Sequence, residues 1–195
     1  MPASAADSPE EAAEAGISPS AGATIRRATP RDAGALAALA ARTFPLACPP
    51  GTTAESIAAH VAEHLSEPRF QRHLADETVT ILVAESGELV GYTMLIAGEP
   101  TDPDVAAAVR VRPAIELSKA YVDAGHHGAG LAARLMAATL AEAASSGARS
   151  VWLGVNDQNA RAIRFYTKSG FAVAGPRSYR VGEQPMTDHV MVAPL

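Results

Sequence analysis

The sequence predicts a mixed α/β fold in which a central, mostly antiparallel sheet of about seven strands is flanked by helices on both faces. Apolar residues alternate along residues 79–84 and return along 89–97 after the turn at Ser86-Gly87, a pattern that predicts an antiparallel hairpin. Strand and helix patterns then alternate from residue 113 to residue 169, which predicts parallel pairing in that region. The 195 residues, 48% of them hydrophobic, are enough for one compact domain.

The chain begins with a segment that is unsuited to folding. Residues 1–23 consist mainly of Ala, Ser, Pro, Gly and acidic residues, so they cannot bury enough apolar surface to offset their ordering entropy, and we expect a disordered tail. A single domain is expected over residues 24–195. It starts with a strand at 24–28, after which Thr29 is typical of an N-cap and Pro30 of a first helical position.

Helical spacing and terminating residues define the other elements. Gly147 and Gly170 each follow a helical pattern, as is common just beyond a helix C-terminus. The expected elements after Pro30 are, in chain order, a helix ending at Pro45, helices at 53–66 and 67–75, the hairpin, a loop at 98–104, a strand at 113–123, a helix at 129–145, a strand at 151–155, a helix capped by Asn156 or Asp157 and ending at Ser169, and strands at 171–180 and 188–193.

Charge, cysteine content and hydropathy narrow the function classes. The formal net charge is −5 and no basic run occurs, which argues against nucleic-acid binding because phosphates require clustered Lys and Arg. Cys48 is the only cysteine, so no intrachain disulfide can form, and a cytoplasmic location is expected. No apolar stretch approaches the roughly 20 residues of a membrane-spanning helix, so no membrane partner is expected. The weakly acidic balance fits a cationic substrate.

A glycine-rich turn between the long strand and the next helix is the strongest local signal. It occupies residues 121–132, with the sequence Tyr-Val-Asp-Ala-Gly-His-His-Gly-Ala-Gly-Leu-Ala. The first amides of a helix have no partner within it, and together with the helix dipole they form an anion site that glycines let a phosphate approach. The alternative is an ordinary strand-to-helix connection. The turn lacks the Gly-Lys-Ser/Thr of a P-loop and the glycine spacing of the Rossmann fingerprint.

A second candidate region follows the strand at 151–155. Asn159, Ala162, Ile163 and Tyr166 are separated by three or four residues, so they share one face of a helix. Tyr166 would present its hydroxyl to the space between the two parallel strands. The alternative is a core tyrosine that satisfies one hydrogen bond.

These two regions resemble motifs A and B of the GNAT acyltransferases. Three residues fall on the motif A pattern Gln/Arg-x-x-Gly-x-Gly/Ala, namely His127, Gly130 and Ala132. The first of them departs from the usual Gln or Arg. Motif B is matched by Asn159, Ala162, Tyr166 and Gly170. The resemblance covers nearly all of residues 24–195 and implies the GNAT fold, with acetyl-CoA as co-substrate and no metal.

The resemblance also implies a cofactor site. The pyrophosphate of CoA would be bound by the backbone amides of Gly128, Ala129, Gly130, Leu131 and Ala132. The His127 side chain would support this loop, and Tyr121 and Val122 would run beside the pantetheine arm. Asn159, Ala162 and Tyr166 would complete the site.

Two catalytic residues are implied as well. Tyr166 would protonate the CoA thiolate that acetyl transfer releases. Glu116 lies six residues before Val122, on the same face of the strand if the strand is regular, and would act as general base toward the amine, often through water. The alternative for Glu116 is an edge-exposed carboxylate without a role.

Within the superfamily, the sequence is most similar to bacterial polyamine acetyltransferases of the PaiA type, which implies spermidine or spermine as acceptor. Glu99, Asp102 and Asp104 form an acidic cluster that could bind such a cation. A protein N-terminus, a lysine or an antibiotic amine are alternative acceptors, and a CoA-binding sensor without turnover is a different class of function. A homodimer is expected by analogy with the family.

One further pattern points to a different chemistry. Residues 60–64 read His-Val-Ala-Glu-His, the inverted zinc-protease pattern His-x-x-Glu-His, with both histidines on one helix face. Nothing else in the sequence supports a zinc protease, and we predict no metal site.

Overall fold

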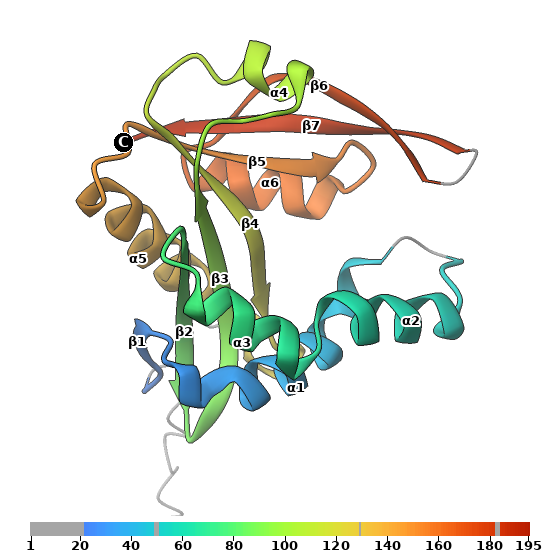
Figure 1. The fold of residues 1–195 in the computed structure, drawn as a ribbon, viewed down its shortest axis with the longest axis vertical. Coiled ribbons are helices and arrows are strands. Elements are labelled where there is room, and N and C mark those ends of the chain that lie inside the picture. The colour runs from blue at the N-terminus through green and yellow to red at the C-terminus, as the bar shows by residue number, and fades with distance from the viewer. Residues whose placement is uncertain (1–21, 49–50, 129, 182–183) are drawn as a thin grey trace, which may run out of the picture.

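The computed structural model describes residues 22–48, 51–128, 130–181 and 184–195, with side chains for all of these except 179–186. Seven strands form one sheet in the order β1-β2-β3-β4-β5-β7-β6 (Figure 1). The strands are β1 (Thr24–Arg27), β2 (Val79–Ser86), β3 (Glu88–Ala97), β4 (Ala114–Val122), β5 (Ser150–Asn156), β6 (Ala172–Val181) and β7 (Gln184–Pro194). The helices are α1 (Ala33–Thr43), α2 (Ala54–His64), α3 (Glu67–Ala75), α4 (Pro103–Ala108), α5 (Leu131–Ser145) and α6 (Ala160–Lys168), with short 3-10 helices η1 (Pro30–Asp32), η2 (Phe44–Ala47) and η3 (Ala124–His126).

The predicted mixture of parallel and antiparallel pairing is confirmed. Neighbouring strands are antiparallel throughout the sheet except for β4 and β5, which are parallel. The hairpin between β2 and β3 turns at Gly87, whose φ of 76° is a left-handed conformation that favours glycine. The tail expected at residues 1–23 lies outside the described residues except for Gly22 and Ala23, and Ala23 is buried.

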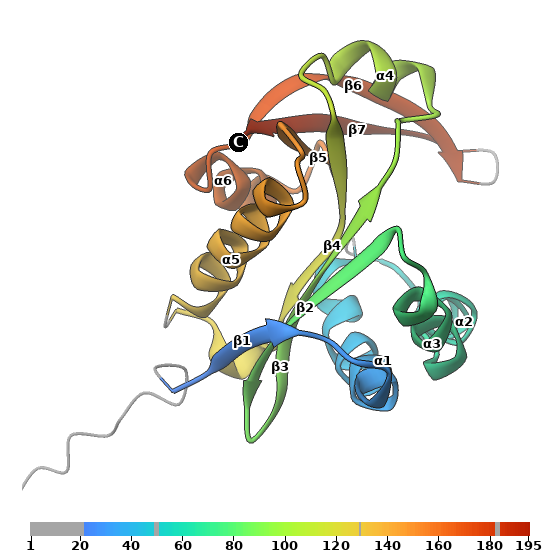
Figure 2. The same ribbon diagram turned by 60° about the vertical axis from the view of Figure 1, so that its left-hand side comes forward.

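Helices cover both faces of the sheet, as the sequence predicts. Helices α1, α2 and α3 lie on one side, called here the first face, and α5 and α6 lie on the other, the second face (Figure 2). The first-face core joins Leu36 and Phe70 of the helices to Tyr92 and Met94 of β3, all of them buried. Among the helices that the structure describes, none combines the length and the apolar character needed to cross a membrane.

Strand β4 is interrupted by a bulge that the sequence does not reveal. Met94 of β3 pairs with Lys119, but the next residue, Leu95, pairs with Leu117, so Ser118 is left without an opposite residue. A bulge of this kind bends the strand and shifts the alternation of its side chains by one position. Two β4 residues that lie an even number of positions apart therefore point to opposite faces of the sheet when Ser118 lies between them.

Helix α4 begins inside the segment 98–104 that we expected to be a loop, so that expectation is wrong for residues 103 and 104. Asp102 caps the helix, because its Oδ1 accepts hydrogen bonds from the amides of Asp104 (2.9 Å) and Val105 (3.3 Å). Pro103 fits the first helical position, where no amide hydrogen is needed. Val105 is fully buried against Ala114 and Trp152. This tertiary contact stabilises a helix too short to be recognised from periodicity.

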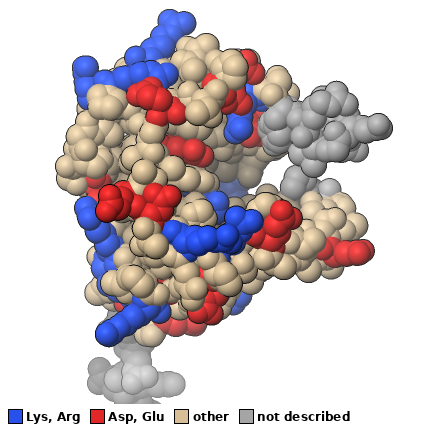
Figure 3. Space-filling model, in the orientation of Figure 1, with Lys and Arg blue, Asp and Glu red and all other residues tan. Residues whose placement is uncertain are grey.

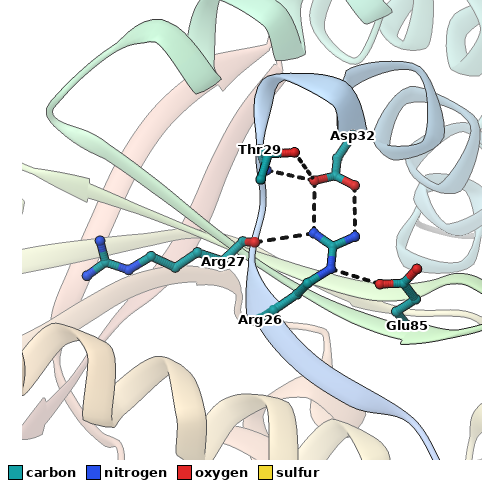
Figure 4. Close-up of polar contacts among 5 residues, drawn as sticks. All are labelled: Arg26, Arg27, Thr29, Asp32 and Glu85. Atoms are coloured by element: carbon teal, nitrogen blue, oxygen red, sulfur yellow. Dashed lines mark hydrogen bonds and ion pairs between the residues drawn. The ribbon is translucent and has the colours of Figure 1, made fainter.

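A polar network joins the first strand to the start of the first helix (Figure 4). The Arg26 guanidinium donates to both carboxylate oxygens of Asp32, each at 2.9 Å, and to Glu85 Oε2 at 2.8 Å. Asp32 also accepts from the backbone amide of Thr29 at 2.6 Å and from its hydroxyl at 2.9 Å. The network ties β1 to β2 and caps the turn that begins with Pro30, which supports the predicted helix start.

Replacing Asp32 with Asn should lower stability at neutral pH by about 1 kcal/mol, because the bidentate ion pair is lost while the contact to the Thr29 amide can persist. For a domain of this size, this corresponds to a Tm lower by about 2–4 °C. The hydrogen bond from Arg26 holds the pKa of Asp32 well below its usual range. The stabilisation is therefore present above the unfolded-state pKa and is lost as the pH falls through the folded-state pKa.

Thermal unfolding at pH 7 and at about pH 3 checks this prediction, with the exposed Glu77→Gln as control. The Tm difference between wild type and Asp32→Asn should shrink at acid pH. An equal difference at both pH values would contradict the assigned role.

Candidate active site

The site begins where β4 and β5 separate. These parallel strands pair only at Ala114–Ser150, Ile115–Val151 and Glu116–Trp152. Beyond that point β4 runs away from β5, which lies across the top of the molecule beside β7 (Figure 1). The part of β4 after Glu116 therefore has no β5 partner for the backbone groups on that edge, and a gap opens in the sheet.

A cavity of about 230 Å³, called here the main cavity, fills this gap. Its wall combines Thr43, Leu46 and Ala47 from the first face with Leu135, Met136 and α6 residues from the second. The cavity therefore passes through the sheet. Seven of the site residues predicted from the sequence line it: Tyr121, Val122, His127, Ala132, Asn159, Ala162 and Tyr166.

The glycine loop places a helix N-terminus beside the main cavity. Gly128 and Gly130 have left-handed φ angles of 85° and 77°, and Gly130 is the N-cap of the 15-residue helix α5 without any side-chain cap. The first amides of α5 therefore need an external partner, and the helix dipole favours an anion. The Leu131 side chain is buried in the second-face core, so only its amide is available. Ala129, predicted to contribute an amide, lies outside the described residues.

His127 connects two elements at the edge of the cavity. Its Nε2 lies 2.9 Å from the carbonyl oxygen of Val122, and its Nδ1 lies 3.0 Å from Nη2 of Arg161. A carbonyl only accepts and a guanidinium only donates, so Nε2 carries the hydrogen and the ring is neutral. His127 thereby joins the end of β4 to α6, and it positions Arg161 in the cavity wall. Arg161 is not among the residues predicted from the sequence, although a cation in the first turn of a helix beside a phosphate site was an available signal.

Asn159 fixes the start of α6, which corrects the predicted cap. Its Oδ1 accepts from the Ala162 amide at 3.0 Å, so Asn159 is the N-cap, and the prediction of Asn156 or Asp157 is wrong. Asn156 instead closes the preceding turn, with its Oδ1 accepting from the Gln158 amide at 3.0 Å. The cap holds Ala162 and Tyr166 of the same helix against the main cavity.

Two phenols reach the main cavity from different elements. Tyr166 of α6 packs edge-on against Phe171, with ring centroids 5.8 Å apart. Burial, together with the nearby Tyr121 phenol, raises the pKa of Tyr166 to about 12, so its hydroxyl keeps its proton at neutral pH. Tyr121 of β4 stacks on Tyr92 at 5.6 Å, and burial raises its pKa as well. Both phenols can therefore donate a hydrogen bond or a proton, and neither is suited to act as a base at neutral pH.

Glu116 does not line the main cavity, and it does not share a face with Val122. Leu117 and Ala120 both pack in the second-face core, on opposite sides of the Ser118 bulge. Val122 belongs with Ala120 on the second face, whereas Glu116 alternates with Leu117 and points to the first. The expectation of a shared face assumed a regular strand and is wrong for that reason.

Glu116 nevertheless occupies the last paired position before the strands separate. Its half-buried side chain lines a second cavity, of about 200 Å³, on the first face. Burial raises the pKa of Glu116, while the nearby cations Lys119 and Arg177 act in the opposite direction. The Glu116 carboxylate thus lies where β4 and β5 separate, on the opposite face of the sheet from Tyr166.

The inverted zinc-protease pattern does not assemble a metal site. The His60 ring stacks on Phe44 with centroids 4.3 Å apart and lies 4.6 Å from the His64 ring. Within the part of the chain that the structure describes, no group of three or more His, Cys, Asp or Glu side chains could hold a metal ion.

The fold that carries this split sheet is shared with acetyltransferases that bind coenzyme A or acetyl-CoA. The PaiA N-acetyltransferase of Thermoplasma acidophilum in complex with coenzyme A has the same fold, with a TM-score of 0.69 and 18% identity over 89% of this chain and 99% of that one. The Salmonella typhimurium protein YncA with its cofactor acetyl-CoA gives a TM-score of 0.59 and 23% identity over 89% and 94%.

The sequence comparison is more specific. An uncharacterized N-acetyltransferase of Mycobacterium tuberculosis is 49% identical over 84% of this chain and 98% of its own length. The Acetyltransferase (GNAT) family model matches residues 41–171. The chain therefore belongs to the GNAT family of acetyl-CoA-dependent acetyltransferases.

Removing the His127 bridge should weaken CoA binding. In His127→Leu both hydrogen bonds are lost, and we expect a Kd for CoA about tenfold higher, the effect of roughly one to two neutral hydrogen bonds. His127→Gln keeps one donor and one acceptor in a similar position, so its Kd should stay within about threefold of wild type. Calorimetric titration with CoA measures both variants. If the Leu variant binds as tightly as wild type, the bridge does not support the cofactor loop.

Proposed function

We propose that this protein transfers the acetyl group of acetyl-CoA to the nitrogen of a small primary amine. The observation that carries the proposal is the cavity through the gap between β4 and β5, with uncapped helix amides at its edge and a buried, protonated phenol in its wall. A sensor that only bound CoA would need the anion site, but it would need neither Tyr166 nor Glu116.

The residues fit coenzyme A along its length. The amides from Gly128 to Ala132 would hold the diphosphate, and Arg161 adds a positive charge nearby. The unpaired edge of β4 at Tyr121 and Val122 would bind the amide groups of the pantetheine arm as a neighbouring strand does. When bound, acetyl-CoA supplies an acetyl group activated as a thioester.

The protein's own groups would move the protons. Glu116, at the point of the gap on the first face, accepts a proton from the amine, directly or through a water molecule. Tyr166, on the other side of the gap, donates its proton to the sulfur that leaves. The proposed base and the proposed acid thus lie on opposite sides of the reacting bond, so no proton passes directly from one to the other.

The polyamine hypothesis rests on the subfamily resemblance, and the acidic cluster adds little to it. Glu99 forms an ion pair with Arg112, and Asp102 Oδ2 accepts from Arg177 Nε at 3.0 Å. Asp104 accepts from the Ser178 amide at 3.2 Å. Spermidine would have to compete with these internal partners. Spermidine and spermine therefore belong in the acceptor panel beside N-terminal, lysine-like and aminoglycoside amines.

Tyr166→Phe should lower the rate of acetyl transfer by about 10²-fold or more, because the leaving thiolate loses its proton donor. The Kd for CoA should stay within about twofold, since the ring is retained. The matched control is Tyr92→Phe. This change removes a buried hydroxyl that has no hydrogen-bond partner among the described residues, so it should leave the rate unchanged. Thiol release and calorimetry measure the two quantities. A full rate for Tyr166→Phe would exclude the assigned role, and a wild type that binds CoA but acetylates no amine would favour the sensor.

Glu116→Gln should remove the acid limb of the pH–rate profile. A general base works only when deprotonated, so activity falls as the pH drops through the pKa of Glu116. Burial raises that pKa, which places the limb at a higher pH than for an exposed carboxylate. We expect the Gln variant to be about 10²-fold slower and to lack this limb in kcat/KM measured from pH 5 to 9. Glu77→Gln, an exposed carboxylate that lines neither cavity, is the control. If Glu116→Gln keeps the acid limb of the pH–rate profile, this limb arises from the titration of another group.

A further inference from the structure

The bulge at Ser118 brings a second charged side chain to the face that carries Glu116. Met94 of β3 pairs with Lys119, and Ile96 of β3 pairs with Glu116. Met94 and Ile96 both pack in the first-face core, so the β4 residues directly opposite them also point to the first face. Since Met94 and Ile96 are two positions apart, the backbones of Lys119 and Glu116 are about 7 Å apart. The two side chains are therefore neighbours along one face of β4.

The Lys119 ammonium has no counterion in direct contact. Lys119 is half-buried, and its side chain forms no ion pair or hydrogen bond with another residue in the part of the chain that the structure describes. Burial lowers the pKa of Lys119, and the Glu116 carboxylate acts in the opposite direction. Glu116 is thus the acidic group that stabilises the Lys119 ammonium. By the same interaction, the ammonium stabilises the ionised form of Glu116.

The other charges near Glu116 are compensated by their own partners. The space-filling view shows a hollow on the first face, with side chains of both charges around it (Figure 3). Glu99 forms an ion pair with Arg112, and Asp102 forms one with Arg177, so the fields of the two partners partly cancel in each case. The pKa of Glu116 follows this difference, because burial raises it, Lys119 lowers it, and Arg177 lowers it to a smaller extent.

Two histidines approach Lys119 from the helices that cover the first face. They are His60 of α2 and His73 of α3. Burial lowers the pKa of both imidazoles, and the Lys119 ammonium contributes in the same direction. Both histidines are therefore neutral at pH 7 and above, where they add no charge that could replace the ammonium.

We propose that Lys119 is a positioning residue that holds Glu116 in its ionised form, ready to accept the proton of the amine at neutral pH. Lys119 acts through its field on the carboxylate, without contact to either substrate. If the ammonium were absent, burial would leave a larger fraction of Glu116 protonated and unable to act as a base. The inference rests on the proposed acetyl transfer and identifies what keeps its base active.

The test measures the pH dependence of kcat/KM from pH 5 to 9 for two variants of Lys119 with the same small amine. Lys119→Met removes the charge but keeps an unbranched side chain, so the acid limb should move to higher pH by about 0.5–1 unit. On the acid side kcat/KM should then be about 3–10-fold lower, while the plateau at high pH should stay within about twofold of wild type. Lys119→Arg keeps the charge and should follow the wild-type profile.

Two controls separate this effect from a structural one. Lys168→Met removes the only other lysine in the sequence, an exposed residue at the end of α6, and should also follow wild type. In a Glu116→Gln background, Lys119→Met should leave the profile unchanged, because the carboxylate on which the ammonium acts is gone. The Kd for CoA and the unfolding temperature report whether each variant is intact.

The outcomes distinguish the inference from the proposed function. An acid limb that does not move in Lys119→Met, or a loss of kcat/KM that is equal at every pH, would overturn the role of Lys119 while leaving acetyl transfer in place. Failure of wild type with every amine would instead reject the proposed function.

Discussion

The short pairing between β4 and β5 is the constraint on which the rest of the site depends. The two strands share three residue pairs, and each is then held by an antiparallel neighbour on its outer side. Strand β5 pairs with β7 along its whole length, from Ser150 to Asn156, so it does not need β4 to stay ordered. The gap is therefore maintained by hydrogen bonds on both sides of it rather than by local strain. One continuous cavity through the sheet is the direct consequence.

This gap lies between the two groups that we propose as the proton donor and the proton acceptor. Tyr166 approaches from the second face, where burial keeps its hydroxyl protonated, and Glu116 stands on the first face at the point of the gap. Burial raises the pKa of both groups, which keeps the Tyr166 hydroxyl protonated and makes the Glu116 carboxylate a stronger base. The Ser118 bulge contributes to this arrangement, because it turns Glu116 to the face opposite Val122. A departure from regular strand geometry thus determines which face carries Glu116.

Local patterns in the sequence predicted the parts of the fold that local forces determine. The hairpin of β2 and β3 follows from alternation and a glycine turn, and the start of α5 follows from Gly128 and Gly130, whose left-handed conformations no other residue adopts easily. The features that were not predicted from the sequence depend on tertiary contacts. Helix α4 forms because Val105 is buried against other elements, and the bulge at Ser118 depends on the register with β3. The bond between His127 and Arg161 spans 34 residues, so no spacing rule could indicate it.

The difference between local and tertiary interactions also explains why the cofactor side and the acceptor side of the site are not equally predictable from the sequence. The cofactor side that we propose uses backbone amides and a strand edge, which depend less on the identity of individual side chains. The acceptor side is built from side chains of several elements, such as Asp102, Trp152 and Arg177. Their chemistry can change without changing the fold, and an 18% identical structure therefore says little about the acceptor.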